Sequence, residues 1–255
     1  MKLTRPTLLR VFWRCLFLQA AWNRRGMQNL GFAYAIAPAL RELYSTEAER
    51  EAALQRHLGF FNCHPYMAAA ILGGAIHHEE LVAAGREPGG APAGFKATLQ
   101  GPLAAVGDGF FWTALRPFFG AVAAVGALTH GWPAVVAALI VYNGIHLALR
   151  WGLFRRGYEK GDGVLADIAR LSLPRLADRL RLLGAVLCGV AVGLLALKAR
   201  QAGGPQDGAV VAVAAGAGLG YVALLRGAPL FPVAYAAAAL VTAVALLGGH
   251  VNGGW

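Results

Sequence analysis

Asp108 is the residue of this sequence best placed to do chemistry, because it is a carboxylate inside an otherwise apolar stretch. That stretch, GPLAAVGDGFFWTALRP, covers residues 101–117. Placing an ionisable side chain in such a segment costs on the order of 3 kcal/mol in a membrane, so the residue usually serves a function. An ionised carboxylate only accepts hydrogen bonds, which suits the hydroxyl groups of a ligand. The alternative is a structural ion pair between Asp108 and Arg116.

Asn62 and His64 form a second polar interruption, within HLGFFNCHPYMAAAILGGAIHHEE, residues 57–80. An amide both donates and accepts hydrogen bonds, and a neutral imidazole does so too, so both side chains could bind hydroxyl groups. Pro65 follows directly and is expected to break the helix at this point. A histidine whose hydrogen bonds are satisfied inside the core is the alternative for His64.

The sequence His77-His78-Glu79-Glu80 suggests a metal site, but its spacing does not support one. Consecutive helical residues point in different directions, so at most two of the four could share an ion, and this is not zinc spacing. We therefore expect no metal and no cofactor. Residues 101–109 lack the Gly-Lys-Ser/Thr ending of a phosphate-binding loop. No nucleophile occurs with a base and an orienting group, so we expect no catalytic residues and no self-contained enzyme.

Helix-breaking residues coincide with both polar interruptions. Proline lacks a backbone N–H and disfavours helix in the residue before it, and glycine lets the chain turn back. In a membrane, freed backbone groups are tolerated only inside protein or beside a watery cavity, and transporters build midplane sites this way. A kink that only packs two helices is the alternative. The expected structural breaks are at Pro65, Gly101, Pro102, Gly109 and Pro117.

The composition predicts an all-α, polytopic membrane protein. Of the 255 residues, 57% are hydrophobic and only 14% are charged, well below the proportion in soluble domains. About 20 apolar residues are needed to cross a bilayer. After residue 131 we expect about four clear transmembrane helices. Because 117–131 is too short for another span, we expect broken or re-entrant helices near 58–80 and 97–131. The four expected spans are 132–149, 182–198, 208–225 and 230–248.

The net charge of +10 is concentrated in segments that flank apolar runs. Basic residues crowd the first 25 positions and the segment 150–181, as they do in cytoplasmic parts of membrane proteins. We therefore expect a membrane protein with a cytoplasmic N-terminus and an outside C-terminus, and no nucleic-acid binding. Residues 6–22 are typical of a basic amphipathic helix, which either lies on the membrane surface or packs on a partner subunit.

These patterns divide the chain into four parts. Residues 1–57 are expected to form interfacial or cytoplasmic amphipathic helices, including a short helix over roughly 47–57 that Thr46 and Glu49 open with a capping box. Residues 58–154 are expected to form a membrane core with broken helices. Residues 155–181 are expected to form a basic cytoplasmic loop, and 182–255 the C-terminal transmembrane helices.

Four segments together resemble the IID component of the mannose/fructose/sorbose branch of the bacterial phosphotransferase system. The combination of Trp-Asn, Met-Gln and Gly-Phe pairs with the Gly-Pro, Gly-Asp, Phe-Trp and Arg-Pro series is highly specific. The resemblance covers roughly residues 8–170, and beyond that only hydropathy is shared. The four segments are LFLQAAWNRRGMQNLGF (16–32), RHLGFFNCHPYMAAAILGGAIHHEE (56–80), KATLQGPLAAVGDGFFWTALRP (96–117) and YEKGDGVLADI (158–168).

The resemblance implies a membrane subunit that pairs obligately with a IIC subunit to form the path for a mannose-type hexose. Cytoplasmic IIA and IIB subunits would carry phosphoryl groups, IIB would phosphorylate the sugar, and IIC–IID pairs would form a higher oligomer. Two departures from the family, Cys63-His64 and a short loop at 199–207, leave open a non-transporting regulatory subunit that docks IIA and IIB. On this basis the sugar path would involve Asn62, His64, Glu79, Glu80, Gly107 and Asp108.

Overall fold

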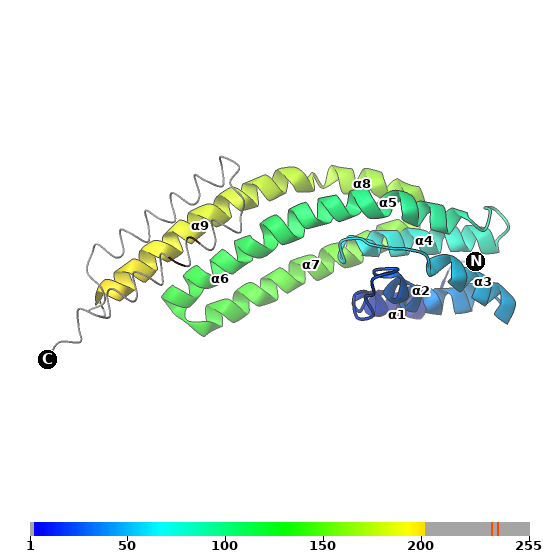
Figure 1. Cartoon of the computed structure of the whole chain (residues 1–255), viewed down its shortest axis with the longest axis horizontal. Helices are drawn as coiled ribbons and strands as arrows, with labels where there is room; N and C mark the ends of the chain where they lie inside the picture. The colour runs from blue at the N-terminus through cyan, green and yellow to red at the C-terminus, as the bar shows by residue number, and fades with distance from the viewer. Residues whose placement is uncertain (1–2, 202–235, 237–238, 240–255) are drawn as a thin grey trace.

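The computed structural model describes residues 3–201 together with the isolated positions 236 and 239. This described part of the chain is built of helices and turns, with two isolated β-bridges and no strand. Figure 1 shows a head of short helices, α1 to α4, at one end and an arm of long helices extending away from it. The expectation of an all-α fold is therefore confirmed.

The head contains α1 (Arg5–Cys15), α2 (Asn29–Leu43), α3 (Glu47–His57) and α4 (Ala68–Ala83). The predicted capping box is confirmed, because the Thr46 side chain accepts from the Glu49 backbone while the Glu49 side chain accepts from the Thr46 backbone. The N-terminal helix ends at Cys15, earlier than residue 22. It buries Val11 and Phe12 and leaves Trp13 exposed.

Helix α4 connects the head to the arm by packing closely on α7 (Trp132–Lys160). A Cβ atom on Gly73 would overlap the carbonyl oxygen of Phe154, and one on Gly157 would overlap that of Ala70. Both glycines therefore let two helix backbones approach, the contact that small residues provide between membrane helices. The Ala/Gly-rich sequence of α4 is buried on nearly all sides, as expected of a central helix.

The arm begins with one uninterrupted helical run. It consists of α5 (Ala91–Gly107), a π-helical segment η1 (Asp108–Leu115) and α6 (Arg116–His130). The structure therefore contradicts the re-entrant turn expected within 97–131. The backbone stays helical through Gly101, Pro102, Gly109 and Pro117, and the only irregularity in this run is its change from α to π geometry.

A physical reason for this continuity is that a proline removes one backbone donor, whereas reversing the chain would free several groups that lipid cannot satisfy. The π segment is also supported by side chains. Thr113 Oγ1 donates to the Gly109 carbonyl oxygen at 2.7 Å, and Arg181 Nη2 donates to the same oxygen at 3.0 Å. Arg181 belongs to α9 (Leu173–Gln201), which packs along η1 and α6.

Within the described part of the chain, two helical runs are long and apolar enough to cross a membrane, Ala91–His130 and Trp132–Leu195. The second run is not straight, because a 3-10 turn η2 (Gly161–Gly163), α8 (Val164–Arg170) and a turn at 171–172 separate α7 from α9. The expected spans 132–149 and 182–198 lie within α7 and α9. Those at 208–225 and 230–248, and the orientation of the C-terminus, concern residues outside the described part.

The basic segment 155–181 is largely helical, and this corrects the loop expected there. Helix α7 continues through Arg155 and Arg156 to Lys160, and α9 begins at Leu173. Charged residues are compatible with a helix where it leaves the bilayer, and Arg155 pairs with Glu159 one turn later at 2.9 Å. Charge therefore indicates where the chain meets water but does not indicate where a helix ends.

Gly157→Ala is expected to destabilise the protein by about 1–3 kcal/mol, because the added methyl group forces α7 away from α4. Gly152→Ala is the matched control, since a Cβ on Gly152 of the same helix meets nothing within 4 Å. Thermal unfolding of the purified full-length chain in one detergent measures both. Equal unfolding temperatures for the two variants would contradict this role of the α4–α7 contact.

Candidate functional site

The candidate site is built on the connection between α3 and α4, residues 58–67, which the head holds without regular secondary structure. Gln28 is the main clamp: its amide nitrogen donates to the Cys63 carbonyl oxygen at 2.9 Å, and its amide oxygen accepts from the Cys63 nitrogen at 3.0 Å. The Gln28 backbone nitrogen also donates to Phe61 at 2.8 Å. Since this side chain is buried, it satisfies backbone groups that would otherwise be unpaired.

The clamp presents His64 to the arm. The His64 side chain packs on Gly107, where a Cβ atom would overlap the imidazole. Its ring stacks on Phe111 with centroids 4.9 Å apart and planes 13° apart, and it lies 4.8 Å from the ring of Trp112. His64 and Gly107, both expected in the sugar path, are thus in direct contact in the structure.

The hydrogen bonding of His64 identifies which ring nitrogen is available. Nδ1 accepts from the Tyr66 backbone nitrogen at 3.2 Å, so the proton of a neutral ring is on Nε2. Nε2 is buried and has no partner among the described residues. A buried donor without a partner is costly, and it is the kind of group that a ligand hydroxyl would satisfy.

Asp108 and Asn62 lie at the exposed edge of the same region. Burial raises the pKa of the Cys63 thiol to about 12, and the charge of Asp108 makes a smaller contribution in the same direction. Asn62 is tied to α5 through its backbone nitrogen, which donates to the Gln100 side chain at 3.0 Å. Among the described residues Asp108 forms no ion pair. The Arg116 guanidinium instead lies 5.3 Å from the centre of the Trp112 ring.

Glu79, the next candidate, is fully buried in a separate network inside the head. Tyr44 donates to Glu79 Oε2 at 2.6 Å, and His57 Nε2 lies 2.8 Å from Oε1. Arg56 forms an ion pair with Oε1 at 3.1 Å, and Lys96 donates to the His57 carbonyl oxygen at 3.2 Å. Glu79 is therefore occupied by protein groups and makes no hydrogen bond or ion pair with His64 or Asp108.

Burial determines the protonation of His57 and Tyr44, the two neutral groups of this network. It lowers the pKa of His57 below its ordinary 6.5; the hydrogen bond to Glu79 opposes this shift, and the charge of Lys96 adds to it. A neutral His57 donates through Nε2 to Glu79 and leaves Nδ1 to face Lys96, at 3.5 Å. Burial, and then the hydrogen bond to Glu79, raise the pKa of Tyr44, so this hydroxyl keeps its proton and donates it.

The rest of the HHEE segment ties helices together. Glu80 accepts from the Leu3 backbone at 2.9 Å and from the Tyr158 hydroxyl at 2.7 Å. His77 contacts the Tyr158 carbonyl oxygen, and His78 lies 2.8 Å from Glu87. Glu80 is therefore occupied in the structure, like Glu79, and neither side chain extends the region around His64.

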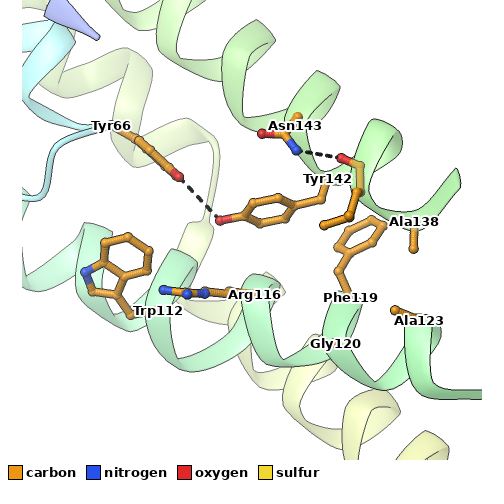
Figure 2. Close-up of a pocket in the computed structure, with 10 residues that line it drawn as sticks. Tyr66, Trp112, Arg116, Phe119, Gly120, Ala123, Ala138, Tyr142 and Asn143 are labelled. Atoms are coloured by element: carbon orange, nitrogen blue, oxygen red, sulfur yellow. Dashed lines mark hydrogen bonds between the residues drawn. The ribbon is translucent and has the colours of Figure 1, made fainter. Parts of the chain in front are cut away.

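A cavity of about 450 Å³ lies beside the His64 region, between α6 and α7. Figure 2 shows Tyr66 and Trp112 at one end of the cavity, with the Tyr66 and Tyr142 hydroxyls 3.5 Å apart. The rings of Tyr66 and Trp112 lie 5.0 and 4.8 Å from that of His64. Sequence reasoning missed Tyr66, Tyr142 and Gln28 as parts of this region. These three residues are recognised only from contacts between segments that are far apart in the sequence. For Gln28 there was one signal, because it is an amide at the start of an apolar helix.

The long apolar arm and the polar region at its base indicate a helical membrane protein. Comparison with known proteins gives the family. Residues 2–197 match the family described as the mannose/fructose/sorbose family IID component of the phosphotransferase system. The chain belongs to this family, and the expectation from its motifs is confirmed. It is thus a IID component, a membrane component of a sugar transporter of the mannose/sorbose type.

Individual relatives agree with this assignment. The mannose-specific EIID component of Escherichia coli strain K12 is 39% identical over 75% of this chain and 68% of its own length. The fructose permease IID component of Bacillus subtilis is 34% identical over 75% and 70%. A solved chain from the mannose transporter ManYZ in complex with microcin E492 is 39% identical with a TM-score of 0.60, covering 75% of this chain and 70% of that one.

Gln28→Leu is expected to loosen residues 58–67, because it leaves the Cys63 N–H and C=O unpaired at about 1–3 kcal/mol each. In a Cys188→Ser background, which removes the exposed thiol, Cys63 should react faster with a thiol reagent in this variant. The exposed Gln19 provides the control Gln19→Leu. A labelling rate that Gln28→Leu leaves unchanged would show that the clamp is dispensable.

His57 is expected to make stability depend on pH. Because its pKa is lowered on folding, its contribution to stability is complete above pH 6.5 and is lost as the pH falls below that value toward the folded pKa. The loss can reach about 1.4 kcal/mol per pH unit. His57→Gln should reduce the drop in unfolding temperature between about pH 7 and about pH 5. His130→Gln, at an exposed position, should not; identical pH profiles for all three proteins would refute the assignment.

Proposed function

We propose that this chain is the IID half of a sugar-transporting complex and forms the sugar path together with a IIC subunit. Uptake is coupled to phosphorylation by IIB, which receives its phosphoryl group through IIA. The observation that carries the proposal is the unpartnered Nε2 donor of His64, enclosed by the Phe111 and Trp112 rings beside Asp108. The sugar is a hexose of the mannose type, as for the relatives at 39% identity.

The region has the groups that a hexose requires. Sugars present hydroxyl groups that both donate and accept, together with apolar C–H faces. His64 Nε2 supplies a donor, Asp108 a charged acceptor, and the ring of Trp112 an apolar surface. Asn62 adds an amide at the exposed edge. The π geometry of η1 supports the same site, because such segments are frequent at functional positions.

The arm presents apolar surface to a membrane environment. Ile140 of α7 is 67% exposed and Leu182 of α9 is also 67% exposed. Lipid and the membrane-embedded IIC subunit cover such surface, and a relative at 39% identity belongs to the solved mannose transporter ManYZ. We place the basic C-terminal end of α7, the basic N-terminal end of α9 and the N-terminus of the chain in the cytoplasm. We place the C-terminus of the chain outside the inner membrane. The IIC–IID pairs assemble into a higher oligomer.

Asp108→Asn tests the site, because it keeps the size of the side chain and removes the charge. Sugar binding by the complex should weaken by about 1.5–3 kcal/mol, the value of a hydrogen bond to a charged group, with the yield of the complex unchanged. Asp162→Asn, at a position 82% exposed, is the control. Binding is measured by isothermal titration of the purified IIC–IID complex with mannose.

Three results would count against the proposal. Unchanged affinity would remove Asp108 from the sugar path. Loss of the complex itself would make Asp108 a structural residue. An intact complex of the unmodified chain that binds no hexose, but still binds IIA or IIB, would favour the regulatory function suggested by Cys63-His64.

A further inference from the structure

The cavity between α6 and α7 changes character along its length. One end is lined by Tyr66, Trp112 and Arg116, whose side chains carry polar atoms. The other end is lined by Ala123, Ala138 and Leu139, whose side chains carry none. Figure 2 shows Tyr66, Trp112 and Arg116 at one end of the cavity and Ala123 and Ala138 at the other, with Asn143 between them. On both α6 and α7 the lining side chains change from polar to apolar in the same direction in space. The cavity therefore has one polar and one apolar end.

Arg116 dominates the polar end. Among the described residues its guanidinium has no hydrogen bond and no carboxylate within ion-pair distance, and it lies over the face of the Trp112 ring, 5.3 Å from the ring centre. The ten residues that line the cavity include no Asp or Glu. A guanidinium group has five N–H donors, and here they have no acceptor although the helix is apolar enough to cross a membrane. These donors would be satisfied by an anion.

Two further donors face the same space. The Tyr66 and Tyr142 hydroxyls lie 3.5 Å apart, so one hydroxyl proton can bridge them while the other stays free to donate. One N–H of Asn143 is used on the Leu139 carbonyl oxygen at 2.7 Å, and the second has no partner. An anion with several oxygen atoms, such as a phosphate, matches this set of donors better than a single carboxylate does.

The position of the cavity across the bilayer is suitable for a lipid. The hairpin between α6 and α7 turns at Gly131, next to Trp132, which is 75% exposed, as expected of a tryptophan at the membrane surface. Arg116 is fourteen residues before His130, roughly 21 Å along the helix, against a hydrocarbon core of about 30 Å. The polar end therefore lies in the half of the bilayer farther from the hairpin, within reach of lipid headgroups.

Basic residues continue beyond the polar end. Arg155 and Arg156 lie farther along α7, beyond Asn143, and both are exposed. In the orientation proposed above, this side faces the cytoplasmic leaflet, which holds anionic lipids. Basic pockets between transmembrane helices on this side are known to bind phospholipid headgroups.

We propose that this cavity binds an anionic phospholipid of the cytoplasmic leaflet. Its phosphate lies against Arg116 and the Tyr142 hydroxyl, and one acyl chain lies along Phe119, Ala123 and Ala138. A carboxylate from a partner subunit would satisfy Arg116 but leave the apolar end empty. A hexose would place hydroxyl groups against alanine side chains, which cannot pair with them.

Native mass spectrometry of the full-length chain, purified in detergent with its co-purifying subunits, tests the proposal. Phosphatidylglycerol is added and its retention is compared with that of phosphatidylcholine and of inorganic phosphate. Arg116→Gln should weaken phosphatidylglycerol binding about tenfold or more, since a hydrogen bond to a charged group is lost. Arg179→Gln makes the same charge change at an exposed position and should leave binding unaltered.

A second variant blocks the cavity without changing its charge. Gly120 lines the cavity and a Cβ there meets nothing within 4 Å, so Gly120→Leu fills the apolar space without disturbing the backbone. It should reduce phosphatidylglycerol binding as Arg116→Gln does. The proposal is overturned if Gly120→Leu leaves lipid binding intact, or if phosphatidylcholine binds equally well. It is also overturned if inorganic phosphate displaces the lipid, or if Arg116→Gln only releases a partner subunit.

Discussion

The pairing of Gln28 with the backbone of Cys63 is the interaction on which the candidate site depends. Residues 58–67 connect two helices inside the protein without making a helix or strand, so their backbone groups need other partners. One amide side chain supplies both a donor and an acceptor to the same residue. The position of His64 against the arm follows, because His64 is the next residue in the chain.

Close approach of backbones is the second constraint. Gly107 gives His64 room beside α5, and Gly73 and Gly157 let α4 and α7 cross in contact. The head is thereby fixed to the arm at the point where the π segment begins. A ligand bound there would therefore contact both the head and the arm.

Part of this arrangement was predictable from the sequence, because it depends on composition and on local pattern. The all-helical membrane fold, the capping box at Thr46 and the family follow from such patterns, and the structure and the comparisons confirm them. The prediction of a re-entrant turn near Pro102 was wrong. The rule that proline breaks a helix considers one residue, and it does not weigh one lost hydrogen bond against the continuity of a forty-residue helical run. The prediction of a loop at 155–181 was wrong for a related reason. Charged residues indicate contact with water, and the end of a helix can also be in contact with water.

The site could be predicted only in part, because its remaining residues meet through tertiary contacts. His64, Gly107 and Asp108 were expected together from two polar interruptions, and the structure brings His64 onto Gly107. Asp108 and Arg116, whose pairing was left open, form no ion pair among the described residues. Glu79 was expected in the path from the resemblance to the family. The partners that occupy it, Tyr44 and His57, come from other helices and cannot be found by spacing.

The central claim is that His64 offers its Nε2 proton to a sugar at the junction of head and arm. A structure of the complete IIC–IID complex with bound mannose, determined by electron cryomicroscopy, tests it most directly. The account predicts density for the sugar within hydrogen-bond distance of His64 Nε2, with Asp108 beside it. Sugar bound elsewhere in the complex, with His64 Nε2 paired to a group of the protein, would contradict the account.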